Sequence, residues 1–68
     1  MDNHVYKIIE ITGTSNISSD DAVNNAISKA SESINNIRWF EVIETRGSIG
    51  DGIVERWQVT VKVGFTMN

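Results

Sequence analysis

Residues 50–65 read GDGIVERWQVTVKVGF, and this stretch decides the fold. From residue 56 onward its side chains alternate strictly between two sets. The apolar set is Trp57, Val59, Val61, Val63 and Phe65, and the other set is Arg56, Gln58, Thr60, Lys62 and Gly64. Strict alternation is typical of a strand with one buried face, because successive side chains point to opposite sides. The stretch therefore predicts a strand over 53–65 whose apolar face meets a core.

The Asp51-Gly52 pair before this strand predicts a hairpin with residues 38–49, RWFEVIETRGSI. Asp-Gly is favoured in two-residue turns because both positions take positive φ. The expected register pairs Gly50 with Ile53, Phe40 with Val63, Val42 with Val61, Trp39 with Gly64, Glu41 with Lys62, Ile43 with Thr60, and Thr45 with Gln58. This parity places Glu44 and Arg46 on the core side, and a β-bulge would shift part of it.

The segments upstream predict a strand and a helix. Residues 4–12, HVYKIIEIT, are rich in β-branched side chains and predict a strand, which the turn-forming residues 13–16 end. Ser18 is the expected helix cap, and Asn35-Asn36 the expected end. One apolar stripe runs along this helix at Val23, Ala26, Ile27, Ala30 and Ile34. The order strand, helix, strand, strand predicts a single α+β domain over 1–68, with an antiparallel sheet in the order 1-3-2 and the helix on one face.

The composition excludes several classes of protein. The 68 residues include ten Ile and seven Val but no Cys, Pro or Leu. A disulfide framework and a cysteine zinc site are therefore impossible, and the single histidine, His4, excludes a multi-histidine metal site within one protomer. A chain this short buries only about 60% of its unfolded surface, so we expect it to be stabilised as an oligomer.

Charge and motif content argue against other functions. The net charge is −3 and the six basic residues are scattered singly, whereas nucleic-acid binding needs a basic stripe. We expect a cytosolic protein, because no apolar run could span a bilayer and the first residues do not resemble a signal peptide. We also expect no enzymatic activity, since the sequence offers no pair of nucleophile and base.

The second face of the predicted sheet is unusual for a monomer. It carries Trp39 and Ile43, and the register places Gly64 opposite Trp39, where the missing side chain leaves room for an indole. A sheet covered on one side only should be polar on the other. An exposed tryptophan there indicates an interface or a ligand site.

These residues make the chain similar to the dodecins, a family of small flavin-binding proteins. The resemblance extends over nearly the whole chain in order and spacing. The matching stretches are Tyr6-Lys7 through Glu10, Gly13-Thr14-Ser15, Asp21-Ala22 with Ala26 and Ala30, Trp39-Phe40-Glu41-Val42, Arg46-Gly47, and WQVTVKVGF from Trp57 to Phe65. No single motif is specific, but their joint pattern is.

The resemblance implies a β-α-β-β subunit in a hollow, roughly spherical homododecamer. It implies storage or buffering of FMN, riboflavin, FAD or lumichrome, bound in pairs between subunits, without catalysis. We assign no residue to a metal site. Trp39 matches the tryptophan that stacks on the isoalloxazine ring, Gln58 the glutamine that hydrogen-bonds the ring edge, and Arg46 an arginine near the flavin. Some members bind coenzyme A through a basic residue at the position of Thr66, so this chain departs from that pattern. A shell that binds another ligand, such as coenzyme A, or none, is the alternative function.

The separation of Trp39 and Gln58 along the hairpin limits how they can bind one ligand. Gln58 lies six residues along the strand from Gly64, the partner of Trp39, which is roughly 20 Å at 3.3 Å per residue. One flavin ring cannot contact both within a flat hairpin. Either a bulge bends the strands, or Trp39 and Gln58 around one ligand come from different protomers.

Overall fold

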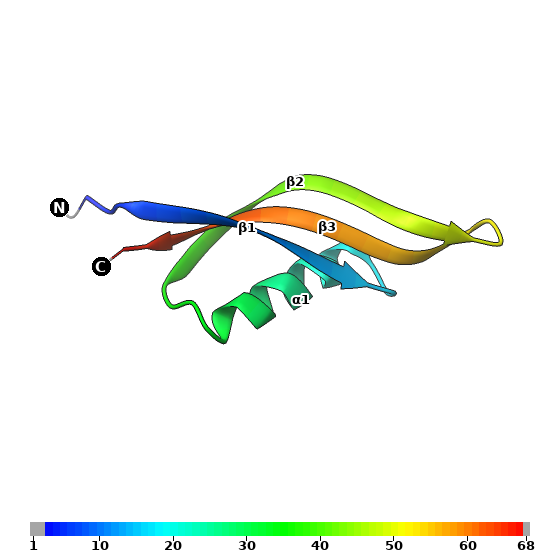
Figure 1. Cartoon of the computed structure of the whole chain (residues 1–68), viewed down its shortest axis with the longest axis horizontal. Helices are drawn as coiled ribbons and strands as arrows, with labels where there is room; N and C mark the ends of the chain where they lie inside the picture. Colours follow the sequence, from blue (N-terminus) through cyan, green and yellow to red (C-terminus); the bar gives the residue numbers. More distant parts are fainter. Residues whose placement is uncertain (1–2, 68) are drawn as a thin grey trace.

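The computed structural model describes residues 3–67 and confirms the predicted architecture. Its elements are β1 (Tyr6–Ser15), α1 (Ser19–Ser31), β2 (Ile37–Gly50) and β3 (Ile53–Thr66). The strands form one antiparallel sheet in the order β1-β3-β2, and α1 lies against one face of it (Figure 1). We call this the helix side, and we call the opposite surface of the sheet the second face. No helix in the described part of the chain has the length and apolar character needed to cross a bilayer.

The helix begins where the sequence predicts and ends earlier. The Ser18 hydroxyl accepts a hydrogen bond of 3.0 Å from the backbone N–H of Asp21, which confirms the predicted cap. The helix stops at Ser31, so the prediction that it reaches Asn35-Asn36 is wrong and Ile34 lies beyond it. Residues 31–36, SESINN, have mostly poor helix propensity, and Asn36 adopts a positive φ of 66° that redirects the chain into β2.

Strand β1 also departs from its predicted end, because it continues through residues 13–15. Gly13 faces α1 inside the strand, where a Cβ atom would overlap the carbonyl oxygen of Ala22 and lie 2.8 Å from the Cβ of Ala26. The glycine therefore allows the helix to approach the sheet closely. The turn follows at Ser15, whose hydroxyl donates to Asp21 at 2.7 Å and accepts from the N–H of Ile17 at 2.9 Å.

Replacing Gly13 by alanine should therefore destabilise the fold. Reducing the freedom of the unfolded chain would favour alanine by about 0.4–1 kcal/mol, but the clash with helix backbone should cost about 1–3 kcal/mol and dominate. Thermal unfolding at matched protein concentration measures the difference. Thr14→Ala, an exposed neighbour in the same strand, should change stability by under about 0.5 kcal/mol. Equal melting temperatures for Gly13→Ala and wild type would refute the close approach.

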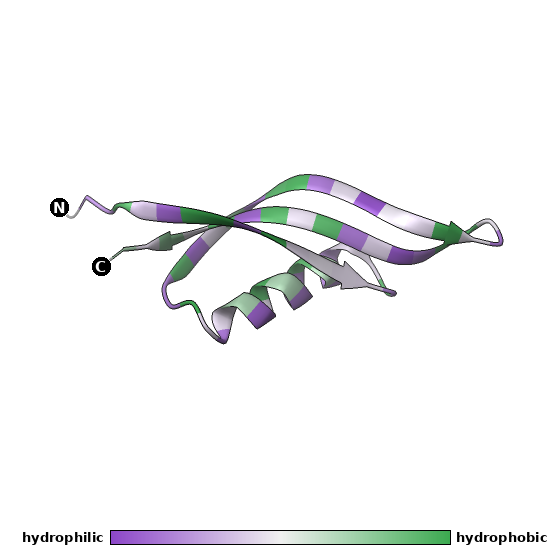
Figure 2. Ribbon diagram, viewed as in Figure 1, coloured by the Kyte–Doolittle hydropathy of each residue, from purple (hydrophilic) through white to green (hydrophobic). Residues whose placement is uncertain are grey.

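The hairpin turn is confirmed, and so is the predicted register next to the turn and in residues 39–42, at the far end of the hairpin. Asp51 and Gly52 both have positive φ, 53° and 76°. The observed pairs include Gly50 with Ile53, Val42 with Val61, Glu41 with Lys62, Phe40 with Val63, and Trp39 with Gly64. The hydropathy of successive residues alternates along much of β3, as the sequence predicts (Figure 2).

Between residues 43 and 48 of β2 the predicted register is wrong, because Ile43 is an extra residue in that strand. Thr60 pairs with Glu44 instead of Ile43, Thr45 pairs with Val59 instead of Gln58, and Arg46 pairs with Gln58. Glu55 is the compensating extra residue in β3, since Ser48 pairs with Arg56 and Ile49 with Val54. Such bulges reverse the side to which the following side chains point. Glu44 and Arg46 therefore lie on the second face and not on the core side.

The core of one chain is small. Three fully buried valines of β3, Val59, Val61 and Val63, pack against Ala22. Trp57 has the predicted core parity and packs against this cluster, partly buried.

The helix packs against β1 and β3, so the helix side of β2 is uncovered and Phe40 and Val42 remain 49% and 46% exposed. The β2–β3 hairpin also extends past the end of α1 (Figure 1), with Ile53 near its tip 69% exposed. So much exposed apolar surface on so small a core is typical of a subunit within an assembly.

Candidate functional site

The indole of Trp39 lies flat across Gly64 on the second face. A Cβ atom at position 64 would overlap the six-membered ring of the indole and lie 2.6 Å from its Nε1. Only glycine at this position lets the ring rest on the backbone, which confirms the predicted fit between the two residues. The side chain remains 36% exposed, so one face of the indole is available to a flat partner.

A second aromatic ring holds the edge of this indole. Tyr6 meets Trp39 with ring centroids 6.1 Å apart and an interplanar angle of 63°, an edge-to-face contact, and His4 lies 6.3 Å from Tyr6. This contact was not predicted from the sequence. The β1–β3 register would reveal it, because Tyr6 pairs with Thr66 and Ile8 with Gly64, which puts Tyr6 beside the residue that carries the indole.

Gln58 and Arg46 lie together on the same face, farther along the hairpin. They are direct cross-strand partners, and both line a small hollow of about 160 Å³. Its lining is Arg46, Gly47, Ser48, Arg56 and Gln58. The Arg46 guanidinium reaches the Glu44 carboxylate at 3.9 Å, and both side chains are exposed, so this ion pair is weak. The bulge at Ile43 is what brings Arg46 beside Gln58.

Lys62 is a further cation on the second face, and its neighbours differ from those of Arg46. It lies between Glu10 and Glu41 across the sheet. Within residues 3–67 neither carboxylate forms an ion pair with Lys62, but two flanking negative charges lower the positive potential there, whereas Arg46 has Arg56 in the same hollow.

The structure does not bring Trp39 and Gln58 together within one chain. Strand β3 pairs with β1 without a register shift from Trp57 to Thr66, so no bulge shortens the path between Gln58 and Gly64. Six residues of extended strand separate these positions by roughly 20 Å. The bulges seen in the hairpin therefore do not close the gap, and a ligand that contacts both kinds of side chain needs two protomers.

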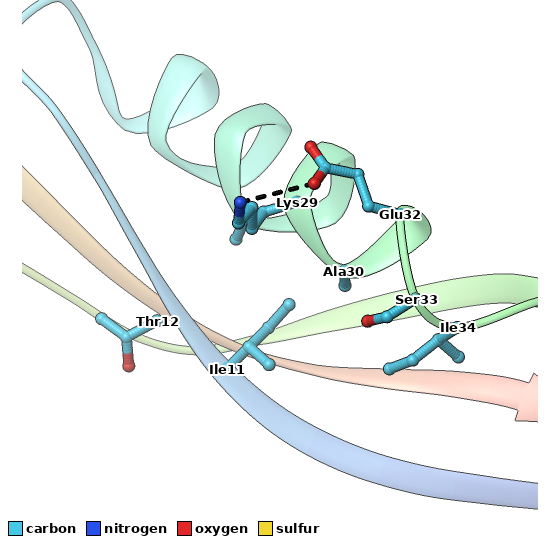
Figure 3. A pocket seen from close by; sticks show the side chains of 8 residues that line it. Ile11, Thr12, Lys29, Ala30, Glu32, Ser33 and Ile34 are labelled. Atoms are coloured by element: carbon cyan, nitrogen blue, oxygen red, sulfur yellow. Dashed lines mark hydrogen bonds and ion pairs between the residues drawn. The ribbon is translucent and has the colours of Figure 1, made fainter.

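A larger hollow lies elsewhere and contains none of the predicted site residues. It measures about 700 Å³ and opens between the end of α1 and β1. Figure 3 shows Ile11 of β1 pointing toward Ala30 and Ile34, with the Lys29–Glu32 ion pair on the helix surface. This lining has no aromatic face for stacking. Among residues 3–67 no three His, Asp or Glu side chains gather in a way that could hold a metal ion.

Comparison with known proteins places the chain in a family. The Dodecin family model matches residues 5–68. The chain is 40% identical over 63 residues to a dodecin of Thermus thermophilus, covering 93% of this chain and 91% of the relative. It is 33% identical over 63 residues to the calcium dodecin of Mycobacterium tuberculosis, covering 93% and 89%.

The solved structure of dodecin from Streptomyces davaonensis has a TM-score of 0.91 to this chain at 46% identity, with 98% of each chain covered. Members of the family are small proteins that usually bind small ligands. A match over almost the full length, in sequence and in structure, shows that the chain belongs to the dodecin family.

Proposed function

We propose that this protein binds flavins between its subunits and acts as a cytosolic flavin store or buffer without catalytic activity. The observation that carries the proposal is the indole of Trp39, laid flat on Gly64 and partly exposed. Isoalloxazine is flat, wide and electron-poor, and an electron-rich indole is a matching face-on partner worth about 1 kcal/mol or more beyond area burial.

Gln58 supplies the polar part of the proposed site. The pyrimidine edge of the flavin ring presents acceptors beside one N–H, and a glutamine amide carries both a donor and an acceptor. Gln58 is half-buried beside Arg46, so its amide is positioned by packing and the neighbouring cation can serve a ribityl or phosphate group. These residue types fit the flavin that the family resemblance implies.

Assembly completes the site in this proposal. Trp39 and Gln58 lie roughly 20 Å apart in one chain. Each flavin therefore contacts the Trp39 indole of one copy and the Gln58 amide of another. Near a two-fold axis, two Trp39 side chains would face each other with flavins stacked between them. The exposed apolar surfaces on β2 and the hairpin tip support the same oligomer, which we propose to be a homododecamer.

Sequestration is the chemistry that such an arrangement favours. Stacking between indoles covers the faces of the flavin ring, which keeps substrates away from it. An adjacent indole also quenches the flavin excited state by electron transfer. Bound flavin should therefore be weakly fluorescent and protected from photochemistry. Both properties suit a store or buffer better than an oxidoreductase.

Fluorescence titration tests the proposal. Riboflavin and FMN should lose most of their emission when the assembled protein is added at micromolar concentration. Persistent strong emission from a saturated complex would contradict the stacked geometry. A colourless protein that quenches neither flavin would favour a shell for another ligand, such as coenzyme A, or for none.

Gln58→Ala should weaken flavin binding by about 1–3 kcal/mol, or about 5- to 150-fold, because the ring edge loses its hydrogen-bond partner. Quenching of the flavin that still binds should persist, since Trp39 is untouched. The same titration measures both quantities. Thr60→Ala is the matched control, because this residue is next on the same face of β3. Equal affinities for wild type and Gln58→Ala would remove Gln58 from the site.

A further inference from the structure

We propose that the hollow beside Gln58 is a phosphate subsite in which Arg56, together with Arg46 and Ser48, binds the phosphate group of the ligand. The inference rests on the proposed flavin function and deepens it. It assigns a binding role to Arg56, and it makes the phosphate monoester FMN the favoured ligand over riboflavin, which has the same ring.

Two β-bulges in the hairpin, one at Ile43 and one at Glu55, create this arrangement. With Ile43 as an extra residue, Arg46 pairs with Gln58 and Ser48 pairs with Arg56. Residues directly opposite each other in an antiparallel pair share a face, and so do residues two apart on one strand. Both guanidinium groups, the Ser48 hydroxyl and the Gln58 amide therefore lie on the second face, and all four residues line the same hollow.

The charge distribution supports an anionic occupant. The chain carries a net charge of −3 and only six basic residues, yet two of them meet here. Among residues 3–67, no carboxylate forms an ion pair with Arg56 within 4 Å. In the described part of the chain, the lining of this hollow has a single ion pair, from Arg46 to Glu44 at 3.9 Å, and both side chains are exposed. A phosphate dianion would offset the repulsion between the two guanidinium groups.

Size and chemistry point to a phosphate group in preference to a ring. The hollow of about 160 Å³ is well below the roughly 300–1,000 Å³ of pockets that enclose a whole drug-sized ligand. Guanidinium groups match phosphate oxygens with paired N–H donors, and the serine hydroxyl adds another. Since Gln58 belongs to the same hollow, a ring held at its amide would have its ribityl phosphate end within reach of Arg56.

Titration of FMN and riboflavin on the assembled protein tests the subsite. Wild type should bind FMN about 10-fold or more tightly than riboflavin at low salt, and added salt should reduce this ratio. Arg56→Gln should weaken FMN binding by about 10- to 100-fold and leave riboflavin binding unchanged. Lys29→Gln is the charge-matched control on the exposed surface of α1, and it should leave the FMN-to-riboflavin ratio unchanged.

Inorganic phosphate separates an ester-specific site from a general anion site. At millimolar concentration it should compete with FMN and leave riboflavin binding unaffected. Equal affinity of wild type for the two flavins would overturn the subsite while leaving the flavin function intact. An equal loss of both flavins in Arg56→Gln would also overturn it, because it would assign Arg56 to assembly. Failure of wild type to bind either flavin would overturn the proposed function together with this inference.

Discussion

Replacement of Trp39 by alanine is expected to reduce flavin affinity by about 30- to 700-fold, or about 2–4 kcal/mol, the range for an aromatic anchor at the centre of a binding site. The variant loses the only ring that the structure lays flat on Gly64, and with it the stacking surface for isoalloxazine. Residual bound flavin should also regain much of its emission, because the neighbouring electron donor is gone. Fluorescence titration reports both the affinity and the emission of the complex.

The chain offers a matched control, because it contains only two tryptophans. Trp57 packs on the helix side against the valine core, so Trp57→Phe should leave flavin affinity and quenching near wild type. Trp39→Phe should retain part of the affinity, since a smaller aromatic ring can still stack. The far-ultraviolet circular dichroism of Trp39→Ala should match wild type, because the indole covers Gly64 on the second face and does not pack against the valine core. Unchanged affinity in this variant would overturn the site.

Ile53→Asp is expected to dissociate the assembly and abolish flavin binding. Ile53 lies near the tip of the hairpin, 69% exposed and beyond the reach of α1, so the change costs little within one chain. A neighbouring copy that covers it would bury an unpaired carboxylate, at a cost of several kcal/mol at each contact. Light scattering after size-exclusion chromatography should show the change from a large particle to small species.

Ser28→Asp is the control for Ile53→Asp, because it adds the same charge at an exposed position of α1. It should leave both assembly and binding near wild type. The decisive measurement is flavin titration of the dissociated subunits. If separated subunits that keep their secondary structure bound flavin as tightly as the assembly, the proposal that two copies build each site would be wrong.

The bulge at Ile43 shows why part of the register escaped sequence reasoning. Strict alternation from the turn placed Glu44 and Arg46 on the apolar side, where charged groups are costly. The strand resolves this conflict with one extra residue, which turns both side chains to the second face. The adjacent apolar pair Val42-Ile43 breaks the alternation and was a sign of conflict. The position of a β-bulge depends on strand twist and cross-strand packing, and the alternation of residues in the sequence does not reveal either.

The ends of β1 and α1 escaped prediction for a related reason. Gly13 resembles a turn residue by type, but its role is to admit α1 against the sheet, a contact that exists only in the folded chain. Ile34 continues the apolar spacing of the helix, yet the poor helix propensity of the preceding residues ends α1 at Ser31. At Gly13 tertiary packing overrides the local turn signal, whereas at Ile34 local helix propensity overrides the apolar spacing.

The sequence by itself determined the element types, their order, the sheet order 1-3-2, the Asp51-Gly52 turn, and the packing of Trp39 on Gly64. These follow from alternation, turn chemistry and cross-strand pairing, which are local properties of the chain. Only the tertiary structure decided that Arg46 joins Gln58 and Arg56 on the second face, and that Tyr6 braces the indole. Those relations depend on one extra residue in a strand and on the pairing of β1 with β3, and both are set by the packing of the whole sheet.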